Sequence, residues 1–164
     1  MLPSTRTDVL IRPQRADHPQ VVMLLAALDT YLAGLYPPEA NHLLSVQELL
    51  AQEVAFFAAW QGDRIVGTGA VRRMPGSDAT AGQPYGEVKR MFVEPAQRGQ
   101  GVAQRLLQAL EDELRARRIG WSLLETGRDQ HEAVQLYQRC GYVIRSTFGG
   151  YPDNGLSVFF EKRV

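Results

Sequence analysis

The chain has 164 residues, of which 45% are hydrophobic and 22% charged, and its 18 basic and 18 acidic residues give a formal net charge of zero. This length and composition predict one globular domain spanning residues 1–164. Nucleic-acid and membrane surfaces usually attract a basic excess, so neither is an expected partner. No apolar run approaches the ~20 residues that cross a bilayer.

The sequence contains one cysteine, Cys140, so no disulfide can form within the chain. A lone cysteine usually packs as a small hydrophobic residue, which suits a reducing compartment. No secretory signal is expected, because no basic start followed by a long apolar run is present, and we predict a cytoplasmic protein. His18, His42 and His131 are dispersed and no cluster has zinc-ligand spacing, so no metal is expected.

The first half of the chain mixes β-type runs with helical periodicity. Residues 9–13 (VLIRP) predict a strand, and apolar residues recur at helical spacing over residues 18–36, where two prolines stop the helix. Ser45 and Glu48 form a capping box that begins a second, short helix. Residues 53–74 predict a β-hairpin around a Gln-Gly-Asp-Arg turn.

The second half predicts a loop over residues 74–84, then a strand–helix–strand unit, a further helix and a hairpin. The expected elements are strands over residues 86–94, 121–126, 141–148 and 156–164, a helix from residue 102 that Gly120 ends, and a helix over residues 131–140. The order β-α-α-β-β-β-α-β-α-β-β is typical of a mixed α/β or α+β sheet. The strand–helix–strand unit predicts two parallel strands.

The stretch RGQG, residues 98–101, stands where a strand hands over to a helix. A helix start exposes unpaired backbone N–H groups and the positive end of the macrodipole. Glycine lets an anion approach that backbone, and Arg98 adds a positive charge. The pattern favours a phosphate or pyrophosphate cradle; the alternative is a tight strand-to-helix turn with no ligand.

Two familiar phosphate loops do not fit this stretch. A Walker A loop requires a Lys-Ser or Lys-Thr pair, and none follows here. The dinucleotide fingerprint would place its first glycines at Gly99 and Gly101 but meets Gln104 at the third position.

Arg98-x-x-Gly101-x-Ala103 follows a strand that ends in Val-Glu-Pro, and it resembles the acyl-CoA-binding motif of the GNAT superfamily of N-acetyltransferases. Ala133-x-x-Leu136-Tyr137-x-x-x-Gly141-Tyr142 resembles the later motif of the same superfamily. The resemblance is strongest over residues 86–164, and the predicted element order agrees with that fold.

The resemblance implies acetyl-CoA as co-substrate. The residues it assigns to the coenzyme are Met91, Phe92, Val93, Arg98, Gly99, Gln100, Gly101, Val102, Ala103 and Gln130. Backbone groups of Met91 and Val93 would bind the pantetheine arm and the acyl carbonyl, where their strand splays from its parallel neighbour. Gln130 stands where many relatives carry Asn, so the same amide sits on a longer side chain.

The strand over residues 87–93 carries three charges, although its place in the order is central. Alternation puts Glu87, Lys89, Met91 and Val93 on one face and Val88, Arg90 and Phe92 on the other. Buried charges are costly unless they are paired or face a wet cavity, so this strand is expected to border an open site.

Two residues are candidates for the proton transfers of acetyl transfer. Glu87 matches a position where several GNAT enzymes place a general base; the alternative is a structural salt bridge with Lys89 or Arg90. Tyr137 matches the tyrosine that protonates the departing thiolate; alternatively it is a core residue of its helix.

The expected acceptor-side residues are Tyr36, His42, Arg73, Lys89 and Tyr151. His42 lies in a stretch that often covers the acceptor in GNAT proteins, although a solvent-exposed loop is an alternative. Tyr151 lies in the last hairpin connection, where it reaches the acceptor or forms a surface turn. Arg73 and Lys89, with two neighbouring arginines, would bind a carboxylate on the acceptor, attract the coenzyme phosphates or be solvated.

Taken together, the residues and the resemblance predict an N-acetyltransferase that transfers acetyl from acetyl-CoA to a small-molecule primary amine by direct attack in a ternary complex. The alternatives are a protein lysine or N-terminal acetyltransferase, a non-catalytic CoA-binding sensor on the same fold, and an enzyme that uses a longer acyl group. The expected state is a monomer or homodimer.

Overall fold

The computed structural model describes residues 8–164, which form a seven-stranded mixed sheet in the order β1-β2-β3-β4-β5-β7-β6 with helices on both faces. The elements are β1 Val9–Pro13, α1 Pro19–Ala33, α2 Val46–Leu49, β2 Val54–Gln61, β3 Arg64–Met74, β4 Tyr85–Val93, α3 Val102–Ala116, β5 Trp121–Gly127, α4 His131–Arg139, β6 Val143–Arg145 and β7 Ser157–Arg163. Short 3₁₀ turns span Pro38–Ala40, Asp78–Thr80 and Pro95–Gln97. The expected element order and α+β class are confirmed.

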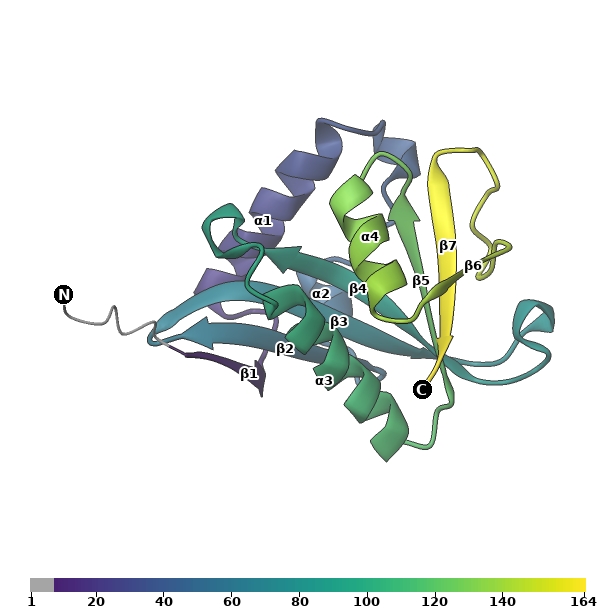
Figure 1. Cartoon of the computed structure of the whole chain (residues 1–164), viewed down its shortest axis with the longest axis horizontal. Coiled ribbons are helices and arrows are strands. Elements are labelled where there is room, and N and C mark those ends of the chain that lie inside the picture. Colours follow the sequence, from purple (N-terminus) through teal and green to yellow (C-terminus); the bar gives the residue numbers. More distant parts are fainter. Residues whose placement is uncertain (1–7) are drawn as a thin grey trace.

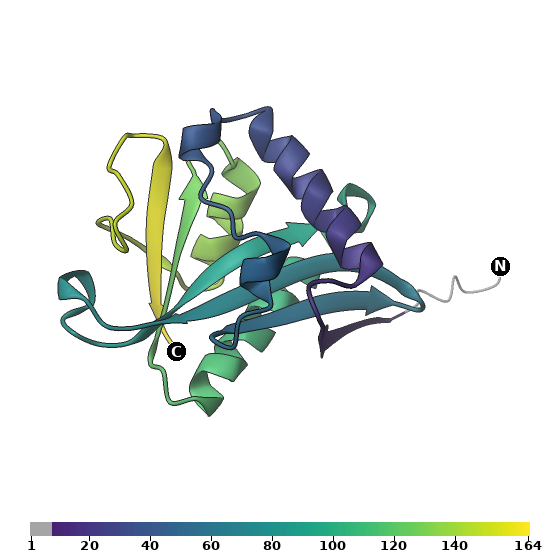
Figure 2. The same cartoon turned by 180° about the vertical axis from the view of Figure 1, so that it is seen from behind.

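The helices cover the sheet in two layers. Figure 1 shows α3 and α4 in front of the sheet, and Figure 2 shows α1 and α2 in front of the opposite face. Leu24, Leu25 and Leu28 of α1 pack in one cluster with Phe56 of β2, whereas Leu110 of α3 belongs to a cluster on the other face. Within residues 8–164, no helix combines the length and the apolar character needed to cross a bilayer.

The sheet consists of two antiparallel halves that meet at β4 and β5. These two strands are parallel, as the strand–helix–strand unit predicts, and they pair only through Gly86 with Ser122 and Glu87 with Leu123. Beyond these pairs the strands diverge, and Figure 1 shows them as the arms of a V. The expected splaying is therefore confirmed, and it leaves strand edges without a neighbour inside the molecule.

A β-bulge lies on β4 at the point where the V opens. The β3–β4 register shifts between Thr68 and Ala70, and Arg90 takes a left-handed conformation with φ 57°. Non-glycine residues rarely adopt this conformation, so it needs support from its surroundings. The Thr68 hydroxyl, which is fully buried, supplies it by donating a 2.9 Å hydrogen bond to the Arg90 carbonyl.

The bulge makes the predicted alternation wrong from Arg90 onward. Lys89 and Arg90 both face the α1–α2 side, where they contact the His42 carbonyl and the Asp29 carboxylate. Met91 packs instead with the α3 cluster, and Phe92 returns to the α1 cluster. The inserted residue shifts the side-chain period by one, which no count of alternate positions can anticipate.

Some element ends also differ from the sequence expectation. The capping box of Ser45 and Glu48 is confirmed. Helix α1 ends earlier, at Ala33, and β6 is limited to Val143–Arg145. Helix α3 ends at Ala116 and not at Gly120, because Arg118 takes the left-handed position and the Ile119 N–H bonds to the Leu114 carbonyl at 2.9 Å.

We predict that Thr68→Val lowers the free energy of unfolding by about 1–2 kcal/mol, because it leaves the buried Arg90 carbonyl without this donor. Urea unfolding followed by circular dichroism measures the change. Thr30→Val is the matched control, since the Thr30 hydroxyl makes a comparable 3.0 Å bond to the Ala26 carbonyl at an exposed site. Equal effects of the two variants would contradict a supporting role for Thr68.

Candidate active site

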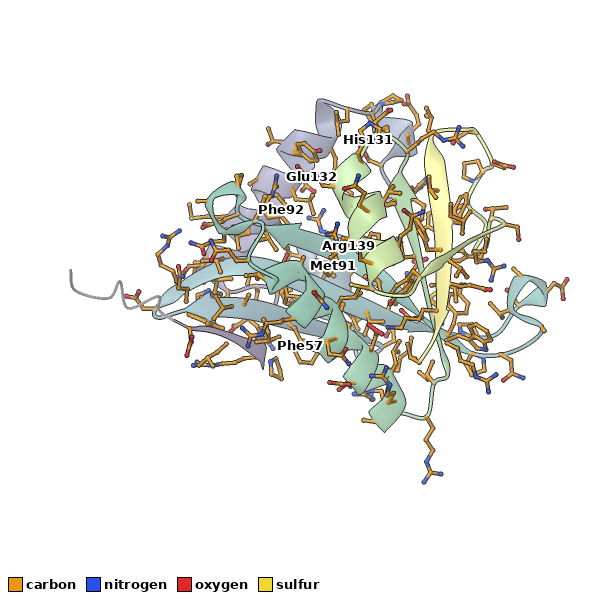
Figure 3. The ribbon with its side chains drawn as sticks, viewed as in Figure 1. Phe57, Met91, Phe92, His131, Glu132 and Arg139 are labelled. Carbon is orange, nitrogen blue, oxygen red and sulfur yellow. The ribbon has the colours of Figure 1, made fainter. Side chains whose placement is uncertain are left out.

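A cleft of 670 Å³ runs between the end of β4, the loop before α3 and helix α4. Of the residues expected at the coenzyme, those lining it are Met91, Phe92, Val93, Arg98, Gly99, Gly101, Val102, Ala103 and Gln130. Gln100 is the member of that set outside the lining. Figure 3 shows Met91 and Phe92 on β4, and His131, Glu132 and Arg139 along α4, which form two walls of the cleft.

The loop before α3 presents unpaired backbone donors to this cleft. The N–H groups of residues 99–104 make no hydrogen bond within the described part of the chain. Gly99 and Gly101 have φ values of 74° and 78°, and a Cβ atom on either would meet nothing within 4 Å. The glycines are therefore required by the backbone conformation and not by packing against protein, and the N–H groups are accessible to an anion.

Arg98 is anchored at the mouth of the cleft. Its Nε donates to the Val93 carbonyl at 3.0 Å, and its guanidinium carbon lies 5.6 Å from the centre of the Phe92 ring. Sequence reasoning missed a second cation, Arg139, in the last turn of α4. Arg139 reaches the cleft because of the way α4 packs against the sheet, and the spacing of residues in the sequence does not reveal this packing.

An inner chamber of 110 Å³ occupies the V between β4 and β5. It shares Leu28, Met91, Gln130, Ala133 and Tyr137 with the cleft, so the two spaces meet at these residues. The Tyr137 side chain is buried, and its hydroxyl makes no hydrogen bond with residues 8–164. Burial raises the pKa of its hydroxyl, which therefore stays protonated at neutral pH.

Tyr36 fixes the loop that joins β5 to α4. Its hydroxyl accepts a 3.1 Å hydrogen bond from the Asp129 N–H, and burial raises its pKa. A Cβ atom on Gly127 would lie 1.9 Å from this hydroxyl, so only glycine leaves room for the contact. Tyr36 thereby ties the end of α1 to the residue before Gln130, which lines both the chamber and the cleft.

An outer pocket of 340 Å³ opens on the α1–α2 side of the sheet. Its lining includes Arg72, Glu87, Lys89 and Tyr151, and it shares His42 and Lys89 with the inner chamber. Cleft, chamber and pocket thus follow one another through the V of the sheet, and we call this series of three adjoining spaces the passage.

A cluster of buried Glu87 with half-buried Lys89 and Tyr151 forms the wall between chamber and outer pocket. Glu87 Oε1 lies 3.1 Å from Lys89 Nζ and accepts a 3.2 Å hydrogen bond from the Tyr151 hydroxyl. Lys89 also donates to Tyr151 and, at 3.2 Å, to the His42 carbonyl. The His42 ring packs edge-on against Tyr151 with centroids 4.9 Å apart. Of the alternatives for Glu87, the structure shows an ion pair with Lys89.

The remaining basic residues predicted near the acceptor do not gather in one place. Arg73 donates to the Gln52 carbonyl at 3.0 Å and lines none of the three spaces described above. Arg90 pairs with Asp29 of α1, and its side chain is 3% exposed. Arg72 lines the outer pocket and lies 4.0 Å from Glu53.

Glu125 is a chamber residue that sequence reasoning missed. It lies on β5, and the Ser157 hydroxyl of β7 donates to its Oε1 at 2.7 Å. Burial raises the pKa of this carboxyl, while the Ser157 bond and the Lys89 charge act in the opposite direction. The available signal was a single charged residue, Glu125, in the strand-forming run WSLLET.

Within residues 8–164, no group of three or more His, Cys, Asp and Glu side chains lies close enough together to hold a metal ion.

Comparison with known proteins places this architecture in a family. The profile of the Acetyltransferase (GNAT) family matches residues 21–142. An IAA acetyltransferase of Azospirillum brasilense is 44% identical over 142 residues, which cover 87% of this chain and 89% of that protein.

Two solved structures have the same fold over nearly the whole chain. A Klebsiella pneumoniae protein assigned as an acyl-CoA N-acyltransferase superposes with a TM-score of 0.75 at 32% identity, covering 96% of this chain and 98% of that one. The PaiA N-acetyltransferase of Thermoplasma acidophilum, solved with coenzyme A, gives 0.73 at 16% identity, covering 96% and 99%. The passage through a split sheet, the glycine loop and these similarities lead to one conclusion: the chain belongs to the GNAT family of acetyltransferases.

Proposed function

We propose that this acetyltransferase is a single domain that moves the acetyl group of acetyl-CoA to a primary amine of a small molecule, both reactants being bound together. The observation that carries the proposal is the passage: a cleft with unpaired N–H donors at residues 99–104 meets, at Tyr137, a chamber that borders the outer pocket on the opposite face. Two reactants can therefore approach each other from opposite sides of the sheet.

The cleft suits acetyl-CoA as a substrate. The N–H groups of residues 99–104, at the start of α3, would bind its diphosphate, with Arg98 supplying a positive charge. The edge of β4 from Met91 to Val93, which β5 leaves uncovered, would hold the amide-rich pantetheine arm. Gln130 lies across from it and lines both cleft and chamber.

Tyr137 is the group best placed to protonate the departing sulfur. It stands where cleft and chamber meet, it is protonated at neutral pH, and no described residue uses its hydroxyl. Backbone N–H groups on the open edge of β4 would stabilise negative charge that develops on the carbonyl oxygen. The assignment of Glu87 to proton transfer is less well supported, since Lys89 and Tyr151 occupy its carboxylate.

The closed outer wall favours a small acceptor over a polypeptide. Loops that contain His42 and Tyr151 meet through their rings, and Lys89 bonds to both loops. A peptide groove would need these loops apart. Tyr36, His42 and Lys89 line the chamber and Tyr151 the outer pocket, so the acceptor would pass all four on its way to the coenzyme.

Direct attack by the amine is also supported by the placement of Cys140. This thiol lies at the C-terminal end of α4, is half-buried and lines none of the three spaces. Burial raises its pKa, which disfavours the reactive thiolate. An acetyl-cysteine intermediate therefore has no support in the described residues.

A thiol-release assay with acetyl-CoA tests the proposed function. The panel contains free amino acids, polyamines, aminoglycosides and IAA, the compound named for the Azospirillum relative, and mass spectrometry identifies the acetylated product. We expect release above background with at least one small amine. Tight CoA binding without acetylation of any amine would support a sensor instead, and acetylation of added peptides alone would support a protein acetyltransferase.

We predict that Gly101→Ala raises the Kd for CoA at least about tenfold, a loss of about 1.4 kcal/mol, because a methyl group enters the space in front of the N–H donors. Isothermal titration calorimetry measures the change. Gly82→Ala is the matched control: Gly82 has φ 75° and an equally open Cβ position, in the loop between β3 and β4. Similar losses in both variants would show that backbone strain, and not the cradle, is responsible.

We predict that Tyr137→Phe lowers kcat about 100-fold while the affinity for CoA and the thermal unfolding midpoint stay close to those of the wild type. The reason is that the hydroxyl makes no hydrogen bond with any described residue, so its loss affects the proton donor alone. Steady-state kinetics, calorimetry and thermal denaturation provide the three readouts. Unchanged kcat would remove Tyr137 from the mechanism.

A further inference from the structure

The carboxylates along the passage differ in where they lie. Glu87 lines the outer pocket, and Asp129 and Glu132 line the coenzyme cleft. Among the described residues, Glu125 is the one carboxylate that lines the inner chamber. Tyr137 and Gln130 line this chamber too, and they also line the coenzyme cleft. A group that takes a proton from the attacking nitrogen has to lie in this chamber, because geometry precedes basicity in general-base catalysis.

The same carboxylates differ in how far they are neutralised. Glu87 forms an ion pair with Lys89 and accepts from Tyr151. Glu125 has no ion pair in the described part of the chain, and Ser157 is its hydrogen-bond donor. A buried carboxylate without a cation attracts one, so an ammonium group that enters the chamber would find its electrostatic partner at Glu125.

Resting on the proposed function, we propose that Glu125 receives the ammonium group of the acceptor and accepts its proton, with Ser157 orienting the carboxylate. Glu87, with Lys89 and Tyr151, then forms the wall of the passage. This assigns to β5 the role that the sequence had led us to expect on β4.

The surroundings of Glu125 make it a stronger base than an exposed glutamate. Burial raises its pKa and is the largest influence, and the nearby Glu87 acts in the same direction. Ser157, Lys89 and His42 lower it. The carboxylate also acts on two tyrosines that share the passage, Tyr137 of α4 and Tyr151, whose pKa values it helps to raise. Raising the pKa of a carboxyl brings it closer to that of an amine and favours the transfer.

The proton balance of the transfer is as follows. The ammonium nitrogen gives one proton to Glu125, and its freed lone pair forms the C–N bond to the carbonyl carbon. The C–S bond breaks, the sulfur takes the Tyr137 proton, and a second proton of the nitrogen restores the tyrosine. Glu125 releases its proton to solvent, so ammonium and thioester yield amide, thiol and one proton.

The chamber also limits the acceptor that Glu125 can serve. The chamber volume of 110 Å³ admits only a slender group, and Leu32, Tyr36 and Ala133 are among the residues that line the chamber. We therefore expect a primary amine at the end of an unbranched chain, and not a secondary amine or a hydroxyl, since neither combines small cross-section with a positive charge.

Glu125→Gln is the decisive variant, tested with two amines of similar size, butylamine and the weakly basic trifluoroethylamine. Butylamine is an ammonium ion at neutral pH, whereas trifluoroethylamine is largely neutral. We expect kcat/KM for butylamine to fall about 100- to 10,000-fold and that for trifluoroethylamine to fall much less. Calorimetry should show unchanged CoA affinity, because Glu125 lies outside the cleft.

The pH–rate profile of Ser157→Ala provides a second test, because its expected shift would not occur if Glu125 had only a structural role. Removing its hydrogen bond raises the pKa of Glu125 further, so the acid limb of the pH–rate profile should move to higher pH. Glu113→Gln on the outside of α3 is the control for loss of a carboxylate, and its profile should match the wild type.

The outcomes separate the two levels of the proposal. Wild-type protein that binds CoA but acetylates neither these two amines nor any amine of the panel above would overturn the proposed function and this inference together. Wild-type activity accompanied by equal losses for both amines in Glu125→Gln, with no shift of the acid limb in Ser157→Ala, would overturn the role of Glu125 and leave the acetyltransferase assignment intact.

Discussion

The divergence of β4 from β5 is the constraint on which the whole site depends. Two neighbouring parallel strands normally keep their hydrogen bonds along their length, yet here pairing stops after Glu87 and Leu123. The bulge at Arg90 follows three residues later and is stabilised by the Thr68 hydroxyl and the ion pair with Asp29. A left-handed arginine costs on the order of 1–3 kcal/mol and persists only where its surroundings compensate for it. The protein thus maintains backbone strain at the point where two reactants would meet.

The two ends of the passage differ in whether main-chain or side-chain groups form them. The end proposed to bind the coenzyme relies on main-chain N–H groups and two glycines, whose geometry is fixed by backbone conformation. The end proposed to receive the acceptor relies on side chains from distant segments, including His42, Lys89 and Tyr151. The glycines that shape the backbone donors can be replaced by few other residues, whereas the side chains that form a wall can vary freely. This division is consistent with a family that shares one coenzyme and differs in acceptors.

The features of this structure that could be predicted from the sequence are those that depend on residues close together in the chain. Apolar periodicity gave the element order, and the residues around Gly99 and Gly101 marked the cleft, because both patterns act over a few residues. The bulge was not predictable, since the conformation of Arg90 depends on Thr68 across a strand pair. Glu125 was missed for the same reason: its setting comes from Ser157, 32 residues further along the chain. Arg73, one residue from Arg72, points to a different place because adjacent strand positions face opposite sides.

The lysine that bonds to Glu87, Tyr151 and the His42 carbonyl has a consequence for water. A thioester is hydrolysed when water reaches it. An enzyme that holds one between turnovers therefore benefits from a wall that closes the chamber on the side away from the coenzyme. Lys89 ties the two remote loops that contain His42 and Tyr151 to its own strand at this wall. An amine that entered from this side would have to displace this tie before it could reach the chamber. Selection of the acceptor would then begin at admission, before any bond to the acyl carbon forms.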